Sequence, residues 1–127
     1  MHAKPERQSR GPVLVAIVAS ADEASEALAA GADALDPQGT AAARAIRARH
    51  PDAPCWPAGS RSGQPGPVDC DQGAGSVAAA VAVAAVSTWR GAPAIRTRHV
   101  PAVRRAVDMT TAIRGDRLPA STRRGLA

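Results

Sequence analysis

The sequence predicts an α/β domain in which strands and helices alternate around a parallel sheet. Two observations lead to this prediction. Short apolar runs with β-branched residues alternate with alanine-rich stretches of helical spacing, and glycine or proline separates most of them. The 127 residues have room for one domain of ordinary size. Strands that alternate with helices imply parallel pairing with right-handed crossovers.

The first strand follows a polar lead-in at residues 1–12, which we expect to be mobile. Residues 13–19 (VLVAIVA) form a continuous apolar run, typical of a strand that is buried on both faces. The next four residues, Ser-Ala-Asp-Glu at 20–23, match a capping box, so a helix should begin there and end at Gly31. Residues 32–36 (ADALD) then predict a short second strand.

The second helix should be capped by Thr40 and run to about His50, with its apolar side inward. Residues 53–56 predict a third strand, which two prolines weaken. Residues 58–75 are rich in Gly, Pro, Ser and Asp and predict a long loop with a brief strand at 68–70. Such a loop is either functional or the trace of a deletion.

The closing part should contain a helix, a strand and a helix. Residues 77–90 are apolar nearly all round, so this helix is buried or packed at an interface. Residues 93–97 (PAIRT) predict the last strand, and Pro101 in a first turn begins the last helix, which runs to about residue 114. Its predicted inward stripe is Ala102, Ala106, Met109 and Ile113, with Val103 and Val107 beside it, while Arg104, Arg105 and Asp108 face water.

These elements make one α/β domain at residues 13–115. It divides into the first βα units at 13–57, the loop at 58–75 and a closing αβα unit at 76–115, and a basic tail follows at 116–127. Tyr and Phe are absent and there are two Trp, so small aliphatic side chains must fill a thin core. Oligomerisation would be a natural supplement to the stability of such a core.

The amino-terminal region has no apolar stretch of the secretory type, which predicts a cytoplasmic protein. The longest apolar run, residues 77–86, is much shorter than the roughly 20 residues that span a bilayer, so no membrane is expected. Cys55 and Cys70 are isolated and have no histidine near them in sequence. They predict neither a disulfide framework nor a zinc site.

The net charge of +5 is polarised, because nine arginines follow from Arg90 onward against Asp108 and Asp116. A basic module that binds nucleic acid or a protein is therefore one alternative function. The near absence of aromatic residues for stacking, and the lack of a docking motif, argue against nucleic acid.

Candidate site residues lie at the carboxyl ends of the predicted strands, where parallel α/β folds bind ligands. Arg96 could bind an oxyanion with two hydrogen bonds at the start of the last helix, and Arg98 could add a second cation. The alternative is that Arg96 pairs with Asp36 and that Arg98 is solvated. We expect His99 to be a capping or surface residue rather than a base, and no metal at Asp36 alone.

Residues 75–109 (GSVAAAVAVAAVSTWRGAPAIRTRHVPAVRRAVDM) resemble the closing helix, strand and helix of the dihydropteroate synthase family. The quoted features are a Gly-Ser opening, an alanine-rich helix, a Gly-Ala pair and an Arg-x-His-Asp-Val strand end. A weaker match covers residues 29–39 (AAGADALDPQG) and places Asp36 on the family's aspartate beside the substrate pyrophosphate. The resemblance implies a pterin-binding (β/α) barrel of the TIM type, of which this chain would hold about half the units.

The family enzyme is a transferase of folate biosynthesis that joins a dihydropterin pyrophosphate to p-aminobenzoate, helped by magnesium. The chain departs from the family pattern, because it has no asparagine, its one lysine is Lys4, and Arg98 and His99 replace His and Asp. We therefore expect a non-catalytic relative that binds a pterin or a phosphate-bearing ligand and associates as a homo-oligomer or with a partner protein. The alternatives are an active subunit completed by a partner, which would need magnesium, and an internally deleted gene product.

Overall fold

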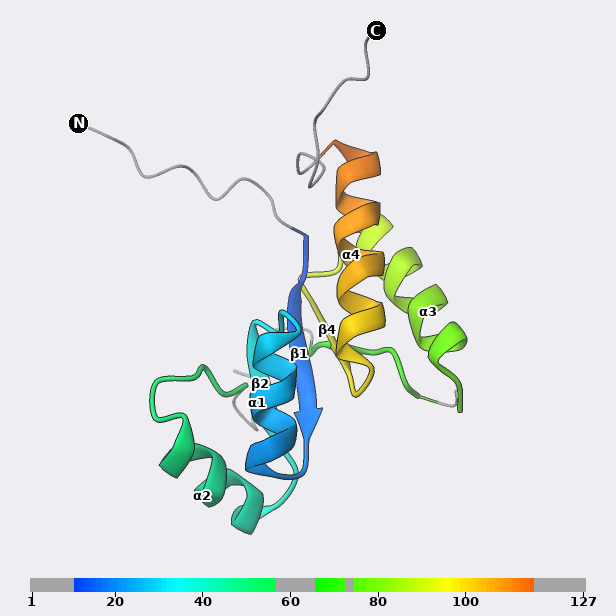
Figure 1. The fold of residues 1–127 in the computed structure, drawn as a ribbon. Helices are drawn as coiled ribbons and strands as arrows, with labels where there is room; N and C mark the ends of the chain where they lie inside the picture. Colours follow the sequence, from blue (N-terminus) through cyan, green and yellow to red (C-terminus); the bar gives the residue numbers. More distant parts are fainter. Residues whose placement is uncertain (1–10, 57–65, 73–74, 116–127) are drawn as a thin grey trace, which may run out of the picture.

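The structure, a computed structural model, describes residues 11–56, 66–72 and 75–115 (Figure 1). Most of the lead-in predicted at residues 1–12, much of the loop predicted at 58–75 and the basic tail predicted at 116–127 lie outside the described residues. Within the described part, strands and helices alternate from β1 to α4, as predicted.

The sheet has four parallel strands in the order β2-β1-β4-β3. The strands are β1 (Val13–Val18), β2 (Ala34–Pro37), β3 (Val68–Asp69) and β4 (Ala94–Thr97). The third strand predicted at residues 53–56 is reduced to an isolated bridge between Leu35 and Cys55 beside β2. The prolines around it explain this, since a proline has no N–H to extend the ladder.

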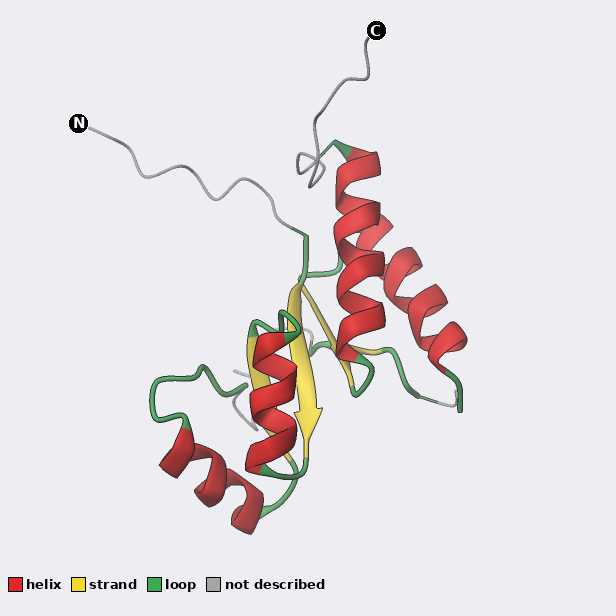
Figure 2. Ribbon diagram, viewed as in Figure 1, coloured by secondary structure: helices red, strands yellow, loops and turns green. Residues whose placement is uncertain are grey.

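The helices are α1 (Ala21–Ala29), α2 (Thr40–Arg49), α3 (Val77–Trp89) and α4 (Val100–Arg114) (Figure 2). Ser20 caps α1 as predicted, because its Oγ accepts a hydrogen bond from the N–H of Glu23 at 3.1 Å. Thr40 is not the cap of α2; it is the first helical residue, and Gly39 with φ 97° precedes it. Among the described residues, no helix has both the length and the apolar character needed to cross a membrane.

All four helices pack on one face of the sheet. The side chains of Leu14, Ala16 and Val18 alternate along β1 and join a buried cluster to which every helix contributes. The helix residues of this cluster are Ala21, Ala24, Ala27, Ala42, Ile46, Ala80, Ala84, Val100, Val103 and Val107. Because side chains alternate along a strand, Val15 and Ile17 point to the opposite face. In Figure 1, α1 and α4 lie in front of the sheet.

The strand order is that of an open arc of a (β/α) barrel. The steps from β1 to β2 and from β3 to β4 go in the same direction, and the last strand lies beside the first. In a closed eight-unit barrel the first strand also lies between the second and the last. A doubly wound sheet would instead carry helices on both faces. The described sheet is therefore the arc that remains when the middle units of a barrel are absent.

The inward face of α4 differs from the predicted one. Val100, Val103, Val107 and Thr111 are buried, whereas Met109 is 66% and Ile113 69% exposed. The prediction was wrong because α4 carries two adjacent apolar stripes, and spacing alone does not rank them. Arg104, predicted to face water, has a side chain only 17% exposed and donates to the carbonyl of Gly31 at 3.2 Å. This contact helps to orient the stripe of Val103 and Val107 toward the sheet.

Candidate functional site

Charged side chains from three strands meet near the carboxyl ends of the sheet. Asp36 lies in β2, Asp69 ends β3 and Arg96 lies in β4. The register pairs Arg96 with Val15 and with Asp69, and pairs Asp36 with Ile17. Neighbouring residues of paired strands share a face, so all three charged side chains lie on the face away from the helices.

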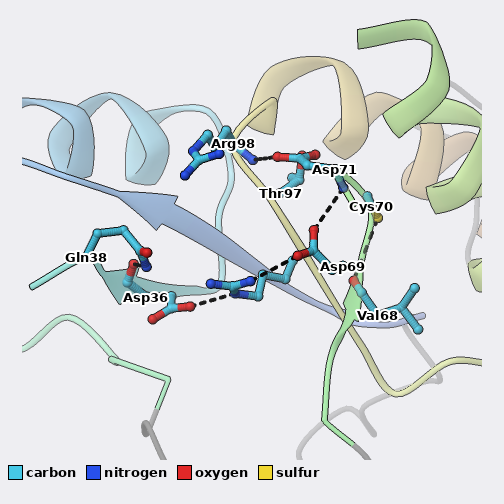
Figure 3. Close-up of polar contacts among 9 residues, drawn as sticks. Asp36, Gln38, Val68, Asp69, Cys70, Asp71, Thr97 and Arg98 are labelled. Atoms are coloured by element: carbon cyan, nitrogen blue, oxygen red, sulfur yellow. Dashed lines mark hydrogen bonds and ion pairs between the residues drawn. The ribbon is translucent and has the colours of Figure 1, made fainter. Parts of the chain in front are cut away.

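Arg96 bridges two carboxylates (Figure 3). Its Nε donates to Asp36 Oδ2 at 2.6 Å, and its Nη1 donates to Asp69 Oδ2 at 3.2 Å. The side chains of Arg96, Asp36 and Asp69 are 26%, 19% and 33% exposed, so the cluster is half-buried but open to solvent. We call these three residues the Asp-Arg-Asp cluster. The pairing of Arg96 with Asp36, the alternative to an anion site, is the arrangement that the structure has.

The turn between β4 and α4 is held by a fourth acid, Asp71. Its Oδ1 accepts from Thr97 Oγ1 and its Oδ2 accepts from the N–H of Arg98, both at 2.7 Å. Thr97 Oγ1 in turn accepts from the N–H of His99 at 2.9 Å. The structure therefore connects Arg98 with Asp71, as Figure 3 also shows, and its exposed side chain is not drawn into the Asp-Arg-Asp cluster.

His99 occupies the N-cap position of α4, but its side chain makes no capping hydrogen bond. The half-buried imidazole thus contributes its backbone, through the bond to Thr97, to the shape of the turn. Gln38, after β2, donates from Nε2 to the carbonyl oxygen of Asp36 at 3.1 Å. This local bond closes the turn next to the Asp-Arg-Asp cluster.

Asp69 and Asp71 were missed as site residues by the sequence reasoning. They lie in a segment that composition identifies as a loop, and the strand that carries Asp69 has two residues. A signal was present, since the short predicted strand at residues 68–70 is followed directly by an acid, as the second strand is. Asp69 Oδ1 also accepts from the N–H of Asp71 at 2.9 Å, so the two acids form one structured turn.

A buried thiol lies between these two acids. Cys70 is fully buried, and its side chain points to the helix side of the sheet. Burial, followed by the negative charge of Asp71, raises the pKa of Cys70 from 9.0 to about 11. The thiol is therefore protonated at neutral pH and has the character of a core residue rather than of a nucleophile.

The magnesium that the family resemblance implies finds no ligand set in the described part of the chain. No group of three or more His, Cys, Asp and Glu side chains there is arranged to hold a metal ion. The three acids at the strand ends face Arg96, Thr97 and the N–H of Arg98 instead. These contacts use the carboxylate oxygens for hydrogen bonds within the protein.

Comparison with models of protein families, with curated proteins and with solved structures found no match to this chain. The resemblance to dihydropteroate synthases therefore rests on the residues quoted for it. The chemistry of the Asp-Arg-Asp cluster has to be argued from its own geometry.

Proposed function

We propose that this chain is a shortened, non-catalytic relative of the dihydropteroate synthases that binds a pterin at the carboxyl ends of its strands. The observation that carries the proposal is the Asp-Arg-Asp cluster on the face of the sheet away from the helices. A barrel binds its ligand at the same end of its strands, within reach of the loops that follow them.

The strand order supports the family part of this proposal. β2, β1, β4 and β3 are neighbours in the order expected for the first two and last two strands of an eight-unit barrel. The residues that resemble the family's last strand form β4, and those that resemble its second strand form β2. Arg96 and Asp36, which come from these two matches, are 60 residues apart in the chain and in direct contact.

The hydrogen-bonding groups of the cluster suit the edge of a pterin. The described contacts of Asp36 use Oδ2, and those of Arg96 use Nε and Nη1. Asp36 Oδ1 and Arg96 Nη2 therefore remain as an acceptor and a donor for a ligand. The aminopyrimidinone ring of a pterin presents N–H donors next to a carbonyl acceptor, and this pattern is complementary to a carboxylate beside a guanidinium.

A pterin fits the cluster better than a free phosphate does. Two carboxylates flank one guanidinium, so the cluster carries a net negative charge. An incoming phosphate would have to displace a carboxylate from Arg96, and it would be repelled by the second one. We therefore place the pterin ring at the cluster.

Catalysis is not part of the proposal. The synthase reaction displaces pyrophosphate from the pterin, which requires stabilisation of charge that develops on the leaving group. The described acids already hold Arg96 and the turn after β4, and they form no metal-binding group. We expect the protein to bind the pterin and to form no dihydropteroate when p-aminobenzoate is added.

The test is calorimetric titration with three ligands, with and without magnesium. These are a dihydropterin pyrophosphate, the same hydroxymethyl pterin without phosphate, and inorganic pyrophosphate. The variants are Asp36→Asn, Arg96→Ala and, as a matched control, Asp52→Asn, whose acid is exposed after α2. Circular dichroism verifies that each variant is folded.

Binding of both pterins that is lost in Asp36→Asn and kept in Asp52→Asn would support the proposal. Binding of pyrophosphate alone would contradict the pterin and indicate an anion site. Absence of heat with all three ligands at millimolar concentration would refute ligand binding of either kind.

A further inference from the structure

The two edges of the described sheet present complementary backbone groups. At one edge, Leu35 donates its N–H to the carbonyl of Pro54 at 2.9 Å and accepts from the N–H of Trp56 at 2.6 Å. Residues 54 and 56 thus turn their hydrogen-bonding groups toward β2. Backbone groups alternate in direction along a strand, so the N–H and C=O of Cys55 point away from the sheet.

The opposite edge is formed by β3. Cys70 donates its N–H to the carbonyl of Arg96 at 2.9 Å, which turns the groups of residues 68 and 70 toward β4. The N–H of Asp69 and the C=O of Pro67 therefore point outward. In a parallel ladder, one residue donates to the residue before its partner and accepts from the residue after it. The C=O of Pro67 and the N–H of Asp69 are this pair of groups for an incoming Cys55.

We propose that a second copy of this chain pairs its Cys55 edge with the β3 edge of the first, with Cys55 opposite Val68. The side chains agree with this register. Cys55 lies beside Leu35 and Val68 lies beside Ile95, and both Leu35 and Ile95 face the helices. Neighbouring side chains of paired strands share a face, so Cys55 and Val68 would meet on the helix side. Pairing shifted by one residue would bring inward-turned groups to the edge.

A second copy is the occupant that the architecture favours. The edges are unlike, so their contact is heterologous and repeats by rotation until it closes a ring or continues as a filament. One copy supplies five strand positions, counting the bridge at Cys55, and all its helices lie on one side. Two copies supply ten positions in a parallel barrel with the helices outside. Three copies would enclose a lumen wider than that of ordinary α/β barrels.

Covalent capture through a new cysteine tests this register. In Val68→Cys, oxidation should join the introduced thiol of one copy to Cys55 of another, because parallel neighbours lie within disulfide reach. The same two positions within one chain are four strand spacings apart, roughly 19 Å, which is too far for a disulfide. The matched control is Val77→Cys, because the native valine at the start of α3 is 45% exposed.

We expect Val68→Cys to form covalent dimer several-fold more than Val77→Cys, and to lose it when Cys55→Ala is added. Equal cross-linking in the two variants would refute the register. A ladder of larger covalent species would refute the closed dimer.

Equilibrium sedimentation of the unmodified chain gives a second measurement. Wild type should sediment as a dimer at high concentration, and Cys55→Pro, which removes only an outward N–H, as a folded monomer. A monomeric wild type at all concentrations would overturn the proposal. No ligand contact enters this inference, so it stands or falls separately from the binding of a pterin.

Discussion

The buried thiol of Cys70 should control how the stability of the fold depends on alkaline pH. Burial and the neighbouring charge of Asp71 raise the pKa of this thiol from 9.0 to about 11. Other groups that titrate in this range are few, because the chain has no tyrosine and its one lysine is Lys4. The alkaline part of the stability curve therefore reports mainly on one buried side chain.

The sign and size of the effect follow from linkage. Below pH 9.0 the thiol is protonated in both the folded and the unfolded chain, so its full contribution to stability is present. Between pH 9.0 and about 11 the unfolded chain releases this proton and the folded chain retains it, so stability falls as the pH rises. At about pH 10.5 the loss amounts to about 2 kcal/mol of unfolding free energy.

Urea unfolding, followed by circular dichroism under reducing conditions, measures this loss at pH 8 and at about pH 10.5. Wild type should lose about 2 kcal/mol between the two conditions through this group. Cys70→Ala should lose much less, and Cys55→Ala, in which an exposed thiol is removed, should behave like wild type. If wild type and Cys70→Ala lose the same free energy, the buried thiol is not the titrating group and the reasoning fails.

Three further predictions concern α4 and the turn that precedes it. Val107→Ala should lower the unfolding free energy by about 2 kcal/mol while Met109→Ala changes it by less than about 0.5 kcal/mol, since only Val107 is buried; equal effects in urea unfolding would contradict the observed face of α4. Arg104→Met should cost about 1 to 3 kcal/mol in the same assay, because the carbonyl of Gly31 and the carboxylate of Asp108 lose a half-buried donor; an unchanged midpoint would exclude a structural role. Asp71→Asn should lower the pKa of Cys70 and reduce the loss of stability between pH 8 and about pH 10.5 relative to wild type; a larger loss would reverse the assigned cause.

Much of the fold could be predicted from short segments. The apolar run of β1, the capping serine of α1 and the glycine that ends α4 each depend on neighbours within a turn or two of the chain. The third strand was the weakest of these predictions, and the structure reduces it to one bridge at Cys55. Local signals were sufficient wherever backbone hydrogen bonding is satisfied within the segment itself.

The candidate site could be predicted only in part. Arg96 and Asp36 were identified because strand ends in a parallel sheet converge, but their pairing remained one of two interpretations. Asp69 was missed, since a strand of two residues inside a Gly- and Pro-rich segment has almost no local signal. Whether a guanidinium at a strand end is open to an anion depends on which acids the neighbouring strands bring to it.

The sequence by itself determined the alternation of strands and helices, the parallel sheet that follows from it and the edge where charged residues gather. Tertiary structure alone decided the strand order, the face of α4 that is buried and the partners of Arg96. The physical reason is the distance along the chain: the two ion pairs of Arg96 join residues 60 and 27 positions apart. Such contacts form only when the whole sheet is assembled, whereas a cap or a strand run is specified by residues that are already neighbours.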